Sequence, residues 1–179
     1  MQRFIIIILI LFISGPIFAQ SIGYRDESEN ILIVGTNYMT TNPLSNRITG
    51  IALEVLTNKT TGENTVNISL LFETLSKTFC QKNSKAIFKT FEGNVITLQE
   101  SLETNSITRE TRDSKYILKP QYSISEEDLQ TIMKEGIQLM RIETLKGLKD
   151  FKYKKDVLGG FLTAEYNLIL EKKDFSSDF

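Results

Sequence analysis

The chain contains no histidine and no tryptophan, and it has a single cysteine, Cys80. Without imidazole, neither a Ser-His-Asp triad nor a Cys-His nucleophile pair can be assembled. The common zinc and non-haem iron sites also need imidazole or several thiolates. Gly159-Gly160 has neither the spacing of a dinucleotide-binding loop nor that of a phosphate-binding loop. The sequence therefore predicts no metal and indicates no cofactor. Any catalysis would rest on carboxylates, lysine or tyrosine, or on a bound cofactor that no motif reveals.

One cysteine cannot form an internal disulfide, so we expect the fold to be held by its core alone. Cys80 is either a reactive thiol or an intermolecular bridge, or else a small core residue or a chance surface thiol. The lack of an activating histidine favours the last two. The 179 residues are 41% hydrophobic, which fits one ordinary domain. Lys and Arg number 21 against 22 Asp and Glu. We expect no nucleic-acid partner, because no basic excess would attract one.

The N-terminal segment has the order of a secretory signal. Arg3 precedes an unbroken apolar run, Phe4 to Ile13, and Ser14-Gly15-Pro16 then breaks it before the small residue Ala19. This predicts a signal peptide over 1–19 and one exported domain over 20–179, in the periplasm or outside the cell. After cleavage no transmembrane span is expected, because the apolar run is short for a bilayer. An uncleaved N-terminal anchor is the alternative.

Alternating apolar residues predict antiparallel hairpins. The first joins strands over 51–55 and 66–72 through a polar loop that contains glycine, and the second joins 85–91 to 95–98 through Glu92-Gly93-Asn94. Short strands are expected at 31–34, which Gly35 would end, and at 116–118. We expect the polar residues 20–30 to be loose. Residues 99–114 would form a long excursion or an exposed strand pair.

Two helices are expected in the C-terminal part. Ser125 is a good N-cap, three acidic residues follow it, and Gly136 is a natural stop, which predicts a helix over about 125–135 and then a strand over 137–144. Residues 162–170 fit both a strand and a helix, but their Ala, Glu, Leu and Lys content favours a helix over about 163–173. Thr163 would cap that helix, with Gly159-Gly160 just before it. The fold class is therefore α+β: an antiparallel β-sheet built from hairpins, with both helices packed on one face or end.

A resemblance supports this fold. The stretches Ser84-Lys85-Ala86-Ile87-Phe88, Tyr122-Ser123-Ile124-Ser125-Glu126-Glu127-Asp128-Leu129 and Met140-Arg141-Ile142 carry it. Over roughly residues 65–170 the chain resembles uncharacterised exported bacterial proteins with β-hairpins, a capped helix introduced by Tyr-x-Ile-Ser, one strand and a closing helix. The resemblance implies an α+β fold in the cell envelope or outside the cell. It implies no activity and transfers no functional residue.

A basic stretch near the C-terminus supplies the candidate ligand-binding residues Lys149, Lys152, Lys154 and Lys155. Phe151 and Tyr153 interleave with these lysines. That alternation favours a half-buried strand with the aromatic rings inward and the lysines in water. The other interpretation is a patch for an anionic partner, such as an acidic glycan or a phosphate-bearing surface.

Paired carboxylates are the only plausible catalytic set, and Glu126, Glu127 and Asp128 point in different directions around a helix start. The leading hypothesis is an exported, non-enzymatic binding or structural module of the bacterial cell envelope. Its partner would be a protein, a glycan or an envelope component. One alternative is a small carboxylate-based hydrolase that acts on envelope or external glycans. Another is a secreted inhibitor or immunity-type protein.

Overall fold

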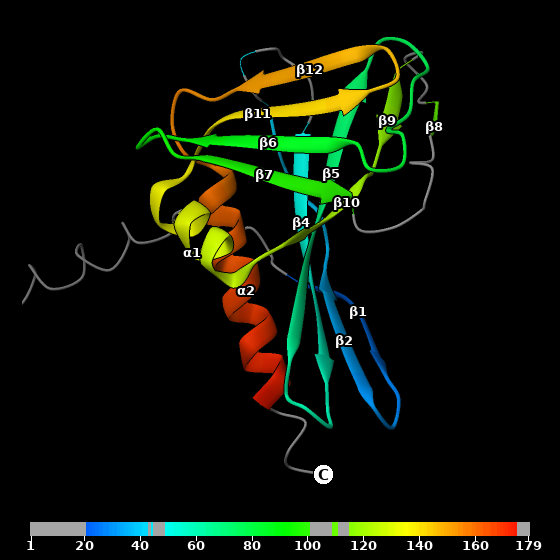
Figure 1. Cartoon of the computed structure of the whole chain (residues 1–179), viewed down its shortest axis with the longest axis vertical. Coiled ribbons are helices and arrows are strands. Elements are labelled where there is room, and N and C mark those ends of the chain that lie inside the picture. Colours follow the sequence, from blue (N-terminus) through cyan, green and yellow to red (C-terminus); the bar gives the residue numbers. More distant parts are fainter. Residues whose placement is uncertain (1–20, 43, 45–48, 101–108, 111–114, 175–179) are drawn as a thin grey trace, which may run out of the picture.

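The computed structural model describes residues 21–42, 44, 49–100, 109–110 and 115–174 (Figure 1). The predicted signal peptide, 1–19, lies outside the described residues, as does most of the segment 99–114. In the described part of the chain, twelve strands form a single antiparallel sheet and two helices accompany it. The sheet dominates and the helices are a minor part, which agrees with the predicted α+β class in its coarse form.

The strands and helices follow one another along the chain in a simple order. They are β1 (Ile22–Glu27), β2 (Ile31–Thr36), β3 (Met39–Thr41), β4 (Thr49–Asn58), β5 (Asn64–Thr74), β6 (Lys85–Thr90), β7 (Val95–Glu100), β8 (Arg109–Glu110), β9 (Tyr116–Leu118), β10 (Gln121–Ile124), α1 (Glu126–Glu135), β11 (Ile137–Thr144), β12 (Gly147–Lys152) and α2 (Leu158–Asp174).

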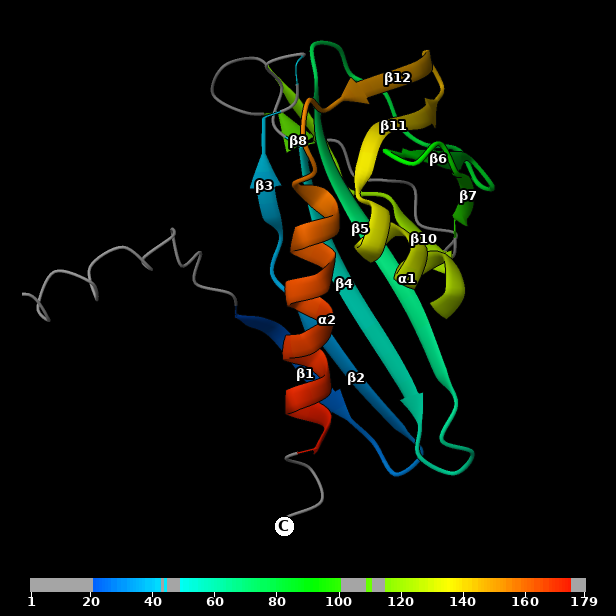
Figure 2. The ribbon, with the colours of Figure 1, turned by 90° about the vertical axis from the view of Figure 1, so that its left-hand side faces the viewer.

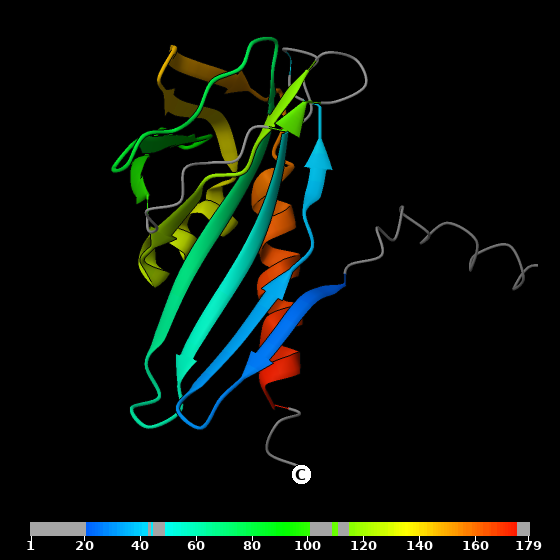
Figure 3. The same ribbon diagram turned by 90° about the vertical axis from the view of Figure 1, so that its right-hand side faces the viewer.

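The sheet has two halves that run in different directions. Its main order is β1-β2-β4-β5-β10-β7-β6-β11-β12, with β3 beside β4, β9 beside β5 and β8 beside β9. Strands β1, β2, β4 and β5 run along the molecule, and α2 packs against β2 and β4 on one face (Figure 2). We call these four strands the covered half. Figure 3 shows their other face, which carries no helix. Strands β7, β6, β11 and β12 run across the molecule, and we call them the open half.

The sheet curls so that its last strand returns to the start of β4. The Phe151 ring of β12 meets the Phe72 ring of β5 edge to face, with centroids 5.5 Å apart. The hydroxyls of Tyr153 and Thr49 lie 2.9 Å apart in a buried hydrogen bond. The Leu44 amide donates to the Lys152 carbonyl at 3.0 Å. These contacts hold the open half against the core and bring Leu44 beside β12.

Both predicted hairpins are confirmed, and the alternating residues form the core. In β4 and β5, Val55 faces Val66 and Leu53 faces Ile68, and all four are at most 3% exposed. Strands β6 and β7 pair as the second hairpin. This register holds because a slip of one residue would turn every apolar side chain to the other face.

Helix α1 forms as its sequence predicts. The Ser125 hydroxyl accepts from the Asp128 amide at 3.1 Å, and the three acidic residues occupy the first turn, where the helix dipole favours negative charge. Gly136 ends the helix with φ of 71°, a conformation that costs glycine little. Ile132 and Leu129 are fully buried.

Helix α2 is present, but it begins earlier than the sequence predicts. Gly159 and Gly160 lie inside its first turn, and Thr163 is not its cap. The Asp156 carboxylate takes that role instead, because it accepts from both glycine amides at 3.0 Å. A Cβ on Gly159 would come within 2.7 Å of the Ile132 carbonyl oxygen, so this glycine allows α2 to start against α1.

Two further expectations are wrong. Residues 20–30 are not loose throughout, because β1 pairs with β2 as an edge strand, with Arg25 opposite Val34. Nearly all of β1 is exposed, which explains why its sequence carries no apolar signal. Strand β2 also continues through Gly35 to Thr36, because Gly35 pairs with Glu54 of β4. The Tyr24 ring occupies the space that a Cβ on Gly35 would fill. Cys80 is 1% exposed and belongs to the hydrophobic core, which is one of the two favoured interpretations and excludes a chance surface thiol.

Candidate functional site

The outward face of the open half brings side chains from three strands into rows. Leu139 of β11 stands between Lys89 of β6 and Lys152 of β12. The next row along β11 has Arg141 paired with Asp150. Their neighbours Met140, Ile142 and Phe151 point to the opposite face and are buried. The charged residues therefore lie on the side of these strands that faces away from the core.

A cavity of about 470 Å³ lies on this face, and we call it the basic groove. It is lined by Leu44, Lys89, Gln138, Leu139, Arg141, Asp150, Lys152 and Tyr153. A smaller hollow of about 250 Å³ adjoins it, because Leu44 and Tyr153 line both, and Lys154 and Lys155 stand around the smaller one. The lining of the basic groove combines apolar or aromatic side chains with three cationic ones and one carboxylate.

The charges of the groove are not all neutralised. Arg141 and Asp150 form a two-pronged ion pair, with both N–O distances 2.7 Å, and the guanidinium lowers the pKa of the Asp150 carboxyl below its usual value. Lys89 and Lys152 are exposed, and neither forms an ion pair with any described residue. Across two strand spacings their Cα atoms are about 10 Å apart, so both side chains can reach one anionic group.

The structure separates the four predicted lysines. Lys152 lines the basic groove, and Lys154 and Lys155 line the adjoining hollow. Lys149 stands opposite Ile142 on the core-facing side of β12 and is half-buried, so it does not join them. The favoured interpretation of the stretch holds for the aromatic residues, because Phe151 and Tyr153 are buried, but Lys149 departs from it.

Sequence reasoning missed Lys89 and Arg141. They come from β6 and β11, and only the pairing of these strands with β12 brings them beside Lys152. Local sequence around each residue shows a single basic side chain on an alternating strand, which is ordinary for an exposed face. The register of three strands was the signal needed to find them.

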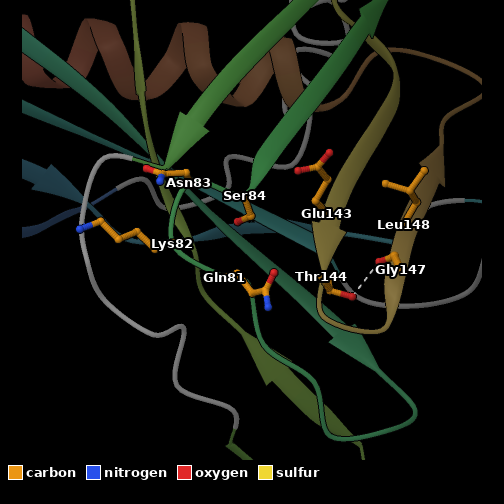
Figure 4. A pocket seen from close by; sticks show the side chains of 8 residues that line it. All are labelled: Gln81, Lys82, Asn83, Ser84, Glu143, Thr144, Gly147 and Leu148. Carbon is orange, nitrogen blue, oxygen red and sulfur yellow. Dashed lines mark hydrogen bonds between the residues drawn. The ribbon is translucent and has the colours of Figure 1, made fainter.

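A second cavity, of about 320 Å³, lies farther along β11 and β12, and we call it the polar hollow (Figure 4). It is lined by Gln81, Lys82, Asn83, Ser84, Glu143, Thr144, Gly147 and Leu148. It forms because the pairing of β6 with β11 stops at Ala86 and Ile142. The Glu143 carboxylate then accepts from the Lys85 amide at 3.0 Å.

The wall of the polar hollow is a tight turn. The Ser84 amide donates to the Gln81 carbonyl at 2.9 Å, and Asn83 takes a positive φ of 66° at the third position of this turn. The Leu145 amide donates to the Phe79 carbonyl at 2.9 Å and joins the segment before this turn to the residue after β11. Backbone hydrogen bonds therefore hold this turn and the segment before it.

An acid is buried away from both cavities. Glu165 lies on α2 and is 1% exposed, beneath Thr36 of β2 and Leu53 of β4. Burial raises the pKa of the Glu165 carboxyl to about 8, while the nearby Thr36 hydroxyl and Leu53 amide act in the opposite direction. The Leu53 amide donates to the Thr36 hydroxyl at 3.0 Å, and that hydroxyl donates to the Leu53 carbonyl at 3.3 Å. Both carboxyl oxygens of Glu165 lack a hydrogen-bond partner among the described residues. The carboxyl is therefore mainly protonated at neutral pH.

Other candidate chemistry is scattered. Glu126 and Glu127 are exposed at the start of α1, and Asp128 accepts from the Ser125 hydroxyl beside them. Among the described residues, no group of three or more Cys, Asp and Glu side chains could hold a metal ion. Neither described helix is long and apolar enough to cross a membrane.

Comparison with known proteins finds no matching family model, no matching curated protein and no matching solved structure. The resemblance of residues 65–170 to uncharacterised exported bacterial proteins stays a prediction from the pattern of elements. The function of this chain has to be inferred from its own surface.

Proposed function

We propose that the protein is an exported, non-enzymatic binding module of the bacterial cell envelope whose basic groove holds an anionic group of its partner. The observation that carries this proposal is the position of Lys89 and Lys152. Both flank Leu139 on the outward face, and neither forms a direct ion pair with a described residue, because the nearby Asp150 carboxylate is paired with Arg141. Export rests on the predicted signal peptide.

The groove favours binding of anions over catalysis. Its one carboxylate, Asp150, is held by Arg141 on two prongs, so it is poorly placed to accept a proton from a substrate. Lysines hold phosphate, sulfate or carboxylate groups as point charges. Lys154 and Lys155 extend the positive surface past Tyr153. An anion with a partly apolar body would contact Leu139 and Leu44 while its charge meets the lysines.

The groove is tested by binding of a sulfated polysaccharide, heparin, to the mature chain. Changing Lys89→Gln and Lys152→Gln together should weaken binding at least tenfold and reduce its dependence on salt. The matched control changes Lys77→Gln and Lys134→Gln. These two lysines are exposed outside the groove, and replacing them removes the same charge. Equal losses in both double variants would show attraction by net charge only and would reject the groove as the site.

Export and the absence of catalysis need separate tests. Mass spectrometry of the protein from native cells should find an N-terminus at Gln20 in the periplasm or the medium. The intact chain with Met1 in the cytosol would contradict export. Turnover of an envelope glycan that is lost on replacing one carboxylate would contradict a non-enzymatic role.

A further inference from the structure

We infer that the ligand is an acidic oligosaccharide that runs along β11 and β12 from the basic groove into the polar hollow. This inference rests on the proposed function and adds the class of ligand to it. The two cavities share one face of the sheet: Arg141 and Asp150 line the groove, and Glu143 and Leu148 form the next row and line the hollow.

The spacing of the two cavities sets the length of the ligand. Lys152 and Leu148 lie four residues apart on β12, which is about 13 Å in an extended strand. A ligand that reaches both cavities must therefore be longer than a single sugar ring. A lone phosphate or sulfate ion could occupy the groove but would not reach the hollow.

The chemistry of the polar hollow fits hydroxyl groups. The exposed amides of Gln81 and Asn83 offer donors and acceptors, and Glu143 offers acceptors. A sugar hydroxyl is both a donor and an acceptor, so it can satisfy each of these groups. Exposed Leu148 adds an apolar contact beside them. The turn that carries Gln81 and Asn83 is fixed before a ligand arrives, which lowers the entropic cost of binding.

The face of the sheet favours a saccharide over an acidic peptide. Extended peptides bind sheets mainly through main-chain hydrogen bonds at an open strand edge. At the C-terminal end of β12 that edge is already used, because the Leu44 amide donates to the Lys152 carbonyl. The two cavities offer side chains on the face of the strands, and side-chain recognition suits a polyhydroxylated ligand.

The experiment measures binding of heparin oligosaccharides of increasing length by calorimetry. The hollow variant combines Gln81→Ala with Asn83→Gly, where glycine keeps the positive φ of this position. It should weaken binding of the longer oligosaccharides roughly tenfold and leave the disaccharide unchanged. The control changes Gln130→Ala and Asn167→Ala, which are exposed on the two helices. Thermal melting checks that each variant is folded.

Several outcomes would overturn the inference. An affinity that does not rise with the length of the oligosaccharide would show that the ligand makes no contact in the polar hollow. An unaffected hollow variant would place the ligand elsewhere. Polyglutamate of matched length that binds as tightly, with the same loss in the hollow variant, would identify an acidic peptide as the ligand. If the oligosaccharides bind and only the groove variant loses affinity, the proposed function survives and this inference fails; if none binds, both fail.

Discussion

The pKa of a carboxyl is shifted in opposite directions at the two halves of the sheet. At the covered half, Glu165 of α2 is buried against β2 and β4, and burial raises the pKa of its carboxyl to about 8. In the open half, Asp150 faces water beside Arg141, and the pKa of its carboxyl is lowered. Desolvation dominates the first site and an ion pair dominates the second. The covered half is therefore where a charge is costly, and the open half is where charges can serve binding.

The largest expected effect comes from Glu165. Its folded pKa lies above the unfolded value of 4.5, so the folded state retains a proton that the unfolded state has lost. Its contribution to stability is full below about pH 4.5 and is lost as pH rises to about 8. The loss reaches up to roughly 4 kcal/mol. We expect Glu165→Gln to melt higher than the natural chain at pH 8 and to lack this part of the pH dependence.

Glu171→Gln provides the matched control, because Glu171 is an exposed acid on the same helix. Its urea unfolding curves should follow those of the natural chain between pH 5 and pH 9. The faces that pack around Glu165 present Thr36 from β2 and Leu53 from β4, and no charged group contributes to its raised pKa. A Glu165→Gln variant with the same pH dependence as the natural chain would show that the carboxyl is ionised in the folded state.

Much of the fold could be predicted because local and long-range preferences agree. Val66, Ile68, Leu70 and Phe72 alternate in the sequence and are all buried in β5. Ser125 and Gly136 cap α1 as their chemistry indicates. The start of α2 could not be predicted, because it depends on Asp156 as a cap and on the close approach of Gly159 to Ile132.

The site was predictable only in part. Lys152, Lys154 and Lys155 are neighbours in sequence, so a basic patch was visible there. Lys89 and Arg141 join them through strand register, which no local pattern encodes. Glu165 also looks like an ordinary polar residue of an amphipathic helix, and its burial depends on how α2 crosses β2 and β4.

An intermediate effect is expected where α2 begins. Gly159→Ala would place a Cβ 2.7 Å from the Ile132 carbonyl oxygen, which is a backbone atom that cannot move aside easily. We expect a loss of about 1–3 kcal/mol in the free energy of unfolding, measured in urea. Gly160→Ala is the internal control, since its nearest neighbour would be Asp156 Oδ2 at 4.0 Å. That variant should be neutral or slightly stabilising, because alanine favours a helix. Equal losses in both variants would argue against the close contact.

The smallest effect on stability is expected in the open half. Arg141→Gln breaks the two-pronged pair with Asp150, but both side chains are more than a third exposed, at 40% and 34%. Exposed pairs typically contribute under about 1 kcal/mol, so we expect a loss of at most that size in urea. The loss in the free energy of heparin binding should exceed the loss in the free energy of unfolding, because the Asp150 carboxylate would then lack its Arg141 partner beside Lys152. Asp150→Asn should have the opposite effect on binding, since it removes the one negative charge that lines the basic groove. Weaker binding in both variants would mean that the ion pair itself shapes the groove, whereas unchanged binding in both would place the anion beyond the reach of this row.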